Sequence, residues 1–103
     1  YSKSMFEYWT EDDFASSFRK MLTIEQFRSE EMQKLYQQYL VAGPASYVKA
    51  LFESIGIVNA KDKAARFYAV MHFYYSLYDG AADKEKVKVE FVSAIKSLVQ
   101  ELK

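Results

Sequence analysis

The side chain best suited to acid–base chemistry in this sequence is His72, the only histidine among 103 residues. A catalytic base needs a partner that orients its ring, and sequence spacing alone places no carboxylate beside His72. The residue also lies inside the most hydrophobic stretch of the chain, where a lone histidine is more often a hydrogen-bonded core residue. Three roles stay open for His72: a partner interface, a ligand pocket, or plain core.

Other catalytic chemistry finds little support in the residue types. The chain has no cysteine, which removes thiolate nucleophiles, thiolate metal ligands and disulfides. It contains no HExxH motif, no nucleophile elbow and no glycine loop of the kind that cradles phosphates. One histidine without cysteines is a poor basis for a transition-metal site. We therefore expect no enzyme, no metal and no cofactor.

The charged residues also limit the possible partners. The acidic runs Glu11 to Asp13 and Glu30 to Glu31 are sufficiently explained as residues of first helical turns, where the helix dipole favours negative charge. Across the chain, 14 Lys and Arg balance 14 Asp and Glu, so no basic field draws it to nucleic acid. The chain by itself is expected to bind DNA poorly. The lack of cysteine fits a reducing compartment, and we expect a cytoplasmic protein.

Aromatic residues are unusually common, at 17% of the chain, and nine of them are tyrosines. A tyrosine offers a large apolar ring with a polar tip, a combination that suits the walls of a pocket for a small organic ligand. The other interpretation is that these rings fill the spaces between irregularly crossed helices. The pocket candidates are Trp9, Phe14, Phe18, Met21, Tyr36, Tyr47, Tyr68 and His72.

Periodicity and capping residues predict that helices position these side chains. The first helix is expected to end near Trp9, followed by Thr10 as the N-cap of a second helix that starts at Glu11 and can extend to Phe27. Ser29 is the predicted N-cap of a third, half-exposed helix. The sequence shows no alternating strand pattern, so we expect an all-α bundle of about five to six helices in a single domain, residues 1–103.

The remaining boundaries are marked by glycine, proline and capping side chains. Gly43 and Pro44 are expected to break or kink the third helix and start a fourth. Gly56 is placed for a left-handed C-cap, with Ile57 folding back on Phe52. Asn59 with Asp62 resembles a capping pair for the fifth helix, which should end near Asp79 and Gly80. Asp83 is the predicted cap of the last helix.

The fifth helix contains the stretch from Ala64 to Tyr78, in which twelve of fifteen residues are apolar or aromatic. A membrane span needs roughly 20 apolar residues. This stretch is shorter, contains Arg66 and His72, and has charged residues on both sides, so we expect no membrane partner. A helix that is apolar on all sides is buried on more than one face, which indicates that something besides its own domain covers it.

Small residues suggest what that cover is. Ala65, Ala69, His72 and Ser76 recur at intervals of four, three and four, so a partner helix could approach closely along this stripe. The bulky residues Phe67, Val70, Phe73, Tyr74 and Leu77 are expected to fill the domain core instead. The last helix also has a broad apolar face. If the fifth and last helices of one chain pack on the same two helices of a second chain, they form a four-helix interface about a two-fold axis. The predicted homodimer interface comprises Ala65, Ala69, His72, Ser76, Phe91, Ile95, Leu98, Val99 and Leu102.

Two long segments carry a family resemblance: FRKMLTIEQFRSEEMQKLYQQYLVAGPASYVKALF, residues 18–52, and ARFYAVMHFYYSLYDGAADKEKVKVEFVSAI, residues 65–95. Their apolar, aromatic and turn residues resemble the C-terminal regulatory domain of TetR-family bacterial transcriptional repressors. Such a protein would begin with a three-helix DNA-binding domain that contains a helix-turn-helix. That domain is absent from this chain.

The resemblance implies a dimer held by the last two helices and an inducer pocket enclosed by the preceding ones. It also implies that a small-molecule effector changes the spacing of the two DNA-binding domains, so that operator DNA is a partner only through the missing domain. Coupling of this kind requires that the ligand favour one spacing over the other. No ligand-contacting position carries over from the family. A second hypothesis remains open, a helical interaction module that dimerises or docks a partner without holding a ligand.

Overall fold

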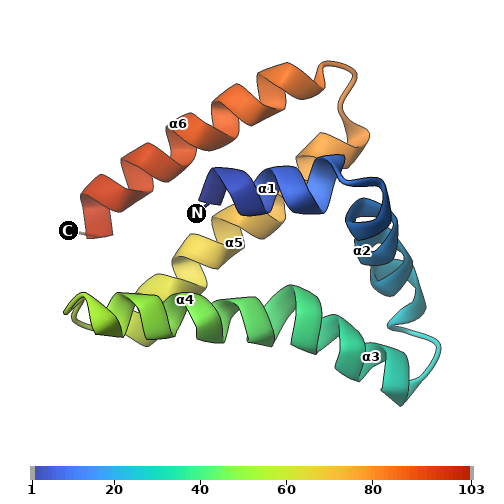
Figure 1. The fold of residues 1–103 in the computed structure, drawn as a ribbon, viewed down its shortest axis with the longest axis horizontal. Helices are drawn as coiled ribbons and strands as arrows, with labels where there is room; N and C mark the ends of the chain where they lie inside the picture. The colour runs from blue at the N-terminus through green and yellow to red at the C-terminus, as the bar shows by residue number, and fades with distance from the viewer. Residues whose placement is uncertain (1, 103) are drawn as a thin grey trace.

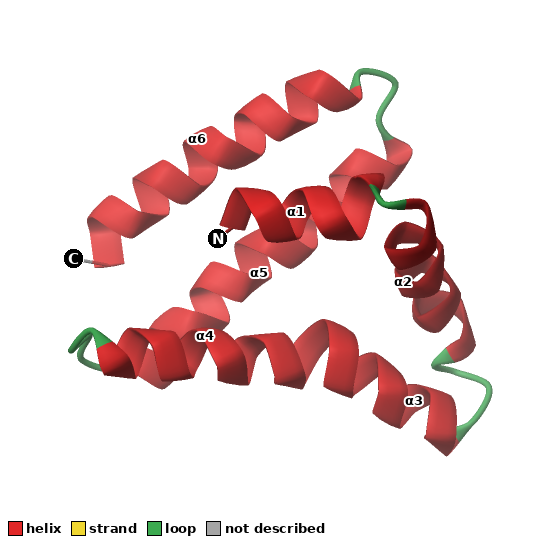
Figure 2. Cartoon of the chain, in the orientation of Figure 1, coloured by secondary structure: helices red, strands yellow, loops and turns green. Residues whose placement is uncertain are grey.

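The computed structural model describes residues 2–102, and these are helical almost throughout (Figures 1 and 2). No strand occurs in this part of the chain, which confirms the all-α prediction. A π-helix labelled η1 continues directly from α3 into α4. In chain order the elements are α1 Ser2–Glu11, α2 Asp13–Glu25, α3 Glu30–Tyr36, η1 Gln37–Val41, α4 Ala42–Ser54, α5 Ala60–Gly80 and α6 Lys84–Leu102.

Helix α5 lies across the middle of the molecule, and α1, α4 and α6 all pack against it (Figure 1). The molecule is flat, with extents of 38 × 34 × 17 Å, so only about two layers of helices fit through its thickness. A thin arrangement of this kind cannot enclose a long helix on every side. Among the described helices, none has the length and hydropathy that crossing a bilayer demands.

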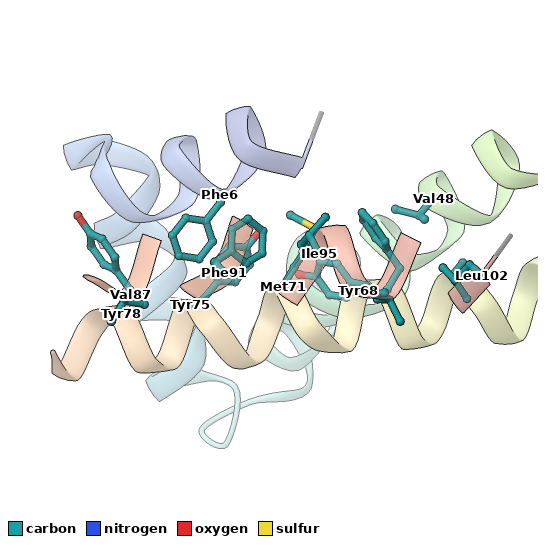
Figure 3. Packing of buried hydrophobic residues seen from close by; sticks show 13 residues of the cluster. Phe6, Val48, Tyr68, Met71, Tyr75, Tyr78, Val87, Phe91, Ile95 and Leu102 are labelled. Atoms are coloured by element: carbon teal, nitrogen blue, oxygen red, sulfur yellow. The ribbon is translucent and has the colours of Figure 1, made fainter. Parts of the chain in front are cut away.

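The main core is organised around Phe6 of α1, whose side chain is 1% exposed. Its ring stacks on Phe91 of α6 at a centroid distance of 4.2 Å and on Tyr75 of α5 at 5.7 Å, and it meets the edge of Tyr78 at 5.8 Å. Figure 3 shows these rings gathered beside α5, with Met71, Tyr68 and Ile95 continuing the row. One phenylalanine therefore joins the first helix to the last two.

A second, smaller core joins α2 to α3 and the π-helix. It consists of Leu22, Tyr36 and Leu40, with Phe18 and Trp9 packed against its edge. Leu22 is completely buried and Leu40 is 1% exposed. This cluster fixes the angle between α2 and the long α3–η1–α4 rod.

The start of α2 differs from the prediction. Helix α1 continues to Glu11, and the N-cap of α2 is Asp12, whose carboxylate accepts a hydrogen bond from the Ala15 amide at 2.9 Å. The Thr10 hydroxyl instead donates to the Phe6 carbonyl at 2.6 Å. Thr10 is buried and still lies inside α1, where a threonine hydroxyl commonly bonds to the carbonyl four residues earlier. The expected extension to Phe27 also stops earlier, because α2 ends at Glu25.

Three other caps are confirmed. The Ser29 hydroxyl accepts from the Met32 amide at 3.1 Å, and Asp83 accepts from the Lys86 amide at 3.1 Å. At Gly56, with φ +81°, the Ile57 amide donates to the Phe52 carbonyl at 3.0 Å, which is the hydrogen bond of a left-handed helix end. Asn59 is different, because its backbone is left-handed and its side chain caps nothing. Its predicted capping pair with Asp62 is wrong. Asn59 contributes only its backbone carbonyl, which accepts the first hydrogen bond of the helix from the Lys63 amide.

The orientation of α5 is also a correction. Its buried face consists of Ala60, Ala64, Phe67, Tyr68, Met71, Tyr75 and Tyr78. Phe73 and Leu77, which were expected in the core, are 57% and 41% exposed. The three helices that pack on α5 all meet the same side of it, and the tyrosines of that side fill the core in place of Phe73 and Leu77.

Gly43 and Pro44 produce a π-helix rather than a break. A Cβ on Gly43 would lie 1.8 Å from the Gln38 carbonyl oxygen, so only glycine fits this widened turn. In an α-helix the carbonyl of Leu40 would accept from the amide of residue 44, and proline has none. The Tyr68 hydroxyl of α5 donates to the Leu40 carbonyl instead. The proline therefore costs the helix one hydrogen bond, and a side chain from the neighbouring helix replaces it.

Replacing Gly43 with alanine tests this explanation. We expect Gly43→Ala to lower the free energy of unfolding by at least about 2 kcal/mol, because the added carbon meets backbone that cannot move aside without rebuilding the turn. Gly80→Ala is the matched control. A Cβ there meets nothing within 4 Å, and alanine in a helix is favoured over glycine by about 0.5–1 kcal/mol. Urea unfolding followed by circular dichroism measures both, and equal effects of the two variants would contradict the strained turn.

Candidate functional site

Two of the pocket candidates, Trp9 and Tyr47, line one groove at the surface. The groove lies between α1 and the junction of η1 with α4, and has a volume of about 310 Å³. We call it the aromatic groove, and its lining residues are Met5, Trp9, Gln38, Tyr39, Gly43, Pro44 and Tyr47. Its walls are mainly aromatic and apolar, with the Gln38 amide and two tyrosine hydroxyls as polar groups, which is the composition expected of a site for a small organic molecule.

Three further candidates pack together elsewhere. The hydroxyl of Tyr36 and Nε2 of His72 are 3.2 Å apart, within hydrogen-bond distance. The Tyr68 ring lies 6.0 Å from the His72 ring, and its hydroxyl is held by the Leu40 carbonyl. Tyr36 and Tyr68 are both buried, so their two rings fill space between α3 and α5.

The last three candidates lie on α2 and do not line the aromatic groove. Phe14 is 75% exposed and Met21 is 39% exposed, both on the outer side of α2. Phe18 is partly buried, with its ring 6.0 Å from Phe14 and 5.5 Å from Tyr39. The single chain therefore does not bring the eight candidates to one common space. The buried residues of α2 are Ala15, Ser16, Arg19 and Leu22, so Phe14 and Met21 face outward.

The most constrained polar group was not predicted. Arg19 of α2 is 6% exposed, and its guanidinium binds both carboxylate oxygens of Asp79 on α5, at 2.8 and 2.6 Å. Its Nε donates to the Trp9 carbonyl near the end of α1, at 3.1 Å, and the guanidinium lies 5.3 Å from the centre of the Tyr75 ring. The planar guanidinium matches the two oxygens of a carboxylate, and through this one side chain α2 is connected to both α1 and α5.

The sequence does carry a signal for Arg19. It falls four residues after Ala15 and three before Leu22, which places a charged residue on the buried face of an amphipathic helix. A buried charge is stable only when it is paired. The sequence could therefore have indicated that Arg19 needs a carboxylate partner, but it could not have said which one.

His72 lies next to this cluster and also lines a second groove. Burial, and secondarily the charge of Arg19, lower the pKa of His72 below its ordinary value near 6.5, so the ring is neutral at neutral pH. We call the second groove the polar groove. It lies between α2 and α5, has a volume of about 450 Å³, and is lined by Arg19, Lys20, Thr23, Ile24, His72, Tyr75, Ser76 and Asp79.

The interface candidates divide by burial. On α5, Ala65, Ala69 and Ser76 are exposed, and Phe73 and Leu77 lie on the same side of the helix. On α6, Phe91, Ile95, Leu98 and Leu102 are all buried against this chain's own core, and Val99 is partly buried. The predicted α6 stripe therefore has little surface left for a partner, because α1 and α5 already cover it.

We call the surface formed by Ala65, Ala69, Phe73, Ser76 and Leu77, together with the adjoining edge of α6, the α5–α6 face. Arg66 and Glu101 form an ion pair at 3.5 Å that joins the two helices at one end of it. At the other end, Leu77 and Gly80 border a shallow groove shared with Lys86 and Glu90. Ser93, Ala94 and Ser97 give α6 a row of small side chains, and Ala94 is the one that is not exposed.

Within residues 2–102, no three His, Cys, Asp or Glu side chains are grouped closely enough to hold a metal ion. A scan against protein-family models finds no match for the chain, and searches of curated proteins and of solved structures find none either.

Removing Asp79 tests the role of the Arg19 cluster. We expect Asp79→Ala to lower the free energy of unfolding by about 3 kcal/mol, because it leaves a buried guanidinium without its counter-charge. Asp62→Ala is a control on the same helix, where an exposed carboxylate in the first turn should contribute less than about 1 kcal/mol. Chemical denaturation of both variants gives the comparison. If Asp79→Ala lowers the free energy of unfolding no more than Asp62→Ala does, the buried guanidinium of Arg19 does not need the Asp79 carboxylate.

Proposed function

We propose that the chain is the effector-binding and dimerisation domain of a TetR-like transcriptional repressor, and that it works as a homodimer. The observation that carries the proposal is the α5–α6 face. Phe73 and Leu77 expose 57% and 41% of their surface on a helix whose opposite side is fully packed. Large apolar side chains gathered on one exposed face indicate an interaction site.

A second copy of the chain fits this face better than an unrelated partner does. Ala65, Ala69 and Ser76 give α5 a line of small residues along which another helix can approach closely. The edge of α6 adds Ser93, Ala94 and Ser97. Two helices from each of two copies would form a four-helix arrangement about a two-fold axis, in which Phe73 packs against the small residues of its mate.

The aromatic groove is the proposed effector site. It has α1 on one side and the π-helix with α4 on the other, and these two walls otherwise have few contacts with each other. A ligand that fills the groove would bridge them. π-helices are frequently found at functional sites, and this one places Gln38 and Tyr39 in the wall.

Helix α1 is proposed to carry the response toward a DNA-binding domain. Its Phe6 side chain is buried in the core, and its Trp9 carbonyl accepts a hydrogen bond from Arg19. Lys88 of α6 adds two ion pairs, with its Nζ 3.1 Å from a Glu7 carboxylate oxygen and 3.2 Å from one of Glu11. A ligand in the aromatic groove would add a contact on the side of α1 that faces α4. It alters operator binding only if it favours one position of α1 over another.

The alternative is a helical module that dimerises or docks a partner and holds no ligand. The same α5–α6 face supports it, and the two functions differ only in the use of the aromatic groove. In the full gene, the repressor proposal also requires a helix-turn-helix segment encoded before Tyr1.

The dimer is tested by placing a charge on the exposed face. We expect Phe73→Asp to weaken dimerisation at least about 30-fold, which corresponds to loss of a central apolar anchor, while the fold is kept because the side chain is exposed in the single chain. Phe27→Asp is the matched control, since Phe27 is 83% exposed in the turn after α2. Sedimentation equilibrium at several concentrations measures both, and a compact monomer for the unmodified chain at tens of micromolar would overturn the proposal.

The effector site is tested by a thermal-shift screen with aromatic, lipidic and cationic compounds. A ligand at 100 times its dissociation constant adds about 2.7 kcal/mol of stability, or about 10 °C or more in Tm for a domain of this size. We expect Tyr47→Ala to abolish most of that shift and Phe14→Ala, an exposed aromatic outside the groove, to leave it unchanged. If no compound raises Tm, the interaction module is the better explanation.

A further inference from the structure

The polar groove between α2 and α5 shares no lining residue with the aromatic groove. It meets the α5–α6 face at one residue, Ser76, which belongs to both surfaces. The proposed effector site makes no use of the polar groove. Its volume of about 450 Å³ is within the range of small-molecule sites.

The charges of the polar groove do not cancel. Two cations, Arg19 and Lys20, line it together with a single carboxylate, Asp79, which leaves one net positive charge. Asp79 is committed to Arg19 through two short hydrogen bonds, whereas Lys20 Nζ lies 4.0 Å from the nearer carboxylate oxygen. Within the described residues Lys20 has no hydrogen bond and forms only this long ion pair with Asp79, so its ammonium is the less compensated of the two cations.

The neutral groups of the groove do not offset its net positive charge. His72 is uncharged at neutral pH, because burial and Arg19 lower its pKa. The Thr23 hydroxyl already donates to the Arg19 carbonyl at 2.8 Å. The Ser76 hydroxyl, one turn before Asp79 on α5, is exposed and has no hydrogen bond within the described part of the chain. Lys20 and Ser76 thus supply donors from opposite walls.

An apolar wall completes the site. Ile24 follows Lys20 by one helical turn and is 66% exposed, which is unusual for isoleucine beside a groove that charged groups also line. The Tyr75 ring forms part of the floor. A ligand with a charged end and an apolar body would match Lys20 and Ile24 at the same time.

We propose that the polar groove is a second binding site, which takes a small singly charged oxyanion with an apolar body, such as an aryl or short alkyl carboxylate. The oxyanion accepts hydrogen bonds from Lys20 and Ser76, and the apolar body covers Ile24. A single negative charge neutralises the groove, while a doubly charged ligand would leave one charge unpaired. The Arg19–Asp79 pair stays intact and forms the fixed end of the site.

The test uses benzoate as the probe and benzamide as its neutral counterpart of the same shape. The isotopically labelled chain is titrated at constant ionic strength, and binding is followed by the NMR shifts of Lys20, Thr23 and Ser76. We expect saturable benzoate binding, weakened about tenfold by Lys20→Gln and about fivefold by Ile24→Ser. Both side chains are exposed, so the fold should be unaffected.

Tyr47→Ala in the aromatic groove is the matched control, and it should leave benzoate binding unchanged even if the proposed effector function is wrong. Equal binding of benzamide would overturn the requirement for an anion. Binding of inorganic phosphate that exceeds that of benzoate would overturn the requirement for an apolar body. No saturation by about 10 mM benzoate, or binding that Lys20→Gln does not change, would overturn the site itself.

Discussion

The arrangement of the helices depends on one buried guanidinium. Arg19 reaches from α2 to Asp79 on α5 and to the Trp9 carbonyl on α1, so three helices meet at a single planar group. Its burial is tolerable only because Asp79 is present, and the geometry of that pair sets the distance between α2 and α5. Both grooves follow from this constraint. The polar groove is the space beside the pair, and the aromatic groove is bordered by the helix whose end Arg19 holds.

Local signals in the sequence predicted most of the secondary structure. Ser29, Gly56 and Asp83 were identified as caps because each acts on backbone within a few residues of itself. Thr10 was misassigned because the sequence offers two suitable capping residues, Thr10 and Asp12, and only the burial of Thr10 decides between them. The orientation of α5 could not be predicted, because nearly every side of it is apolar and the choice of face belongs to the helices that pack on it.

The candidate sites were harder to predict than the fold. Residue type alone grouped eight side chains as pocket candidates, but the packing of the helices separates them into a groove, a packed cluster and an exposed edge. The Arg19–Asp79 pair was not predicted, because the two residues are 60 positions apart in the chain and only the packing of α2 on α5 brings them together. Of the predicted small-residue stripe on α5, Ala65, Ala69 and Ser76 are exposed in the single chain, and His72 is partly buried because it packs beside Tyr36 and Tyr68.

The π-helix has a consequence for the rod formed by α3, η1 and α4. Leu40 and Val48 are eight residues apart, and in a regular α-helix their directions would differ by about 80°, since each residue turns the helix by about 100°. One residue absorbed by the π-turn makes the interval equivalent to seven, which is nearly two whole turns. Leu40 in the small core and Val48 in the large one are both 1% exposed. The π-turn therefore brings Leu40 and Val48 to the same side of one continuous helical rod, so that this side packs against two separate cores.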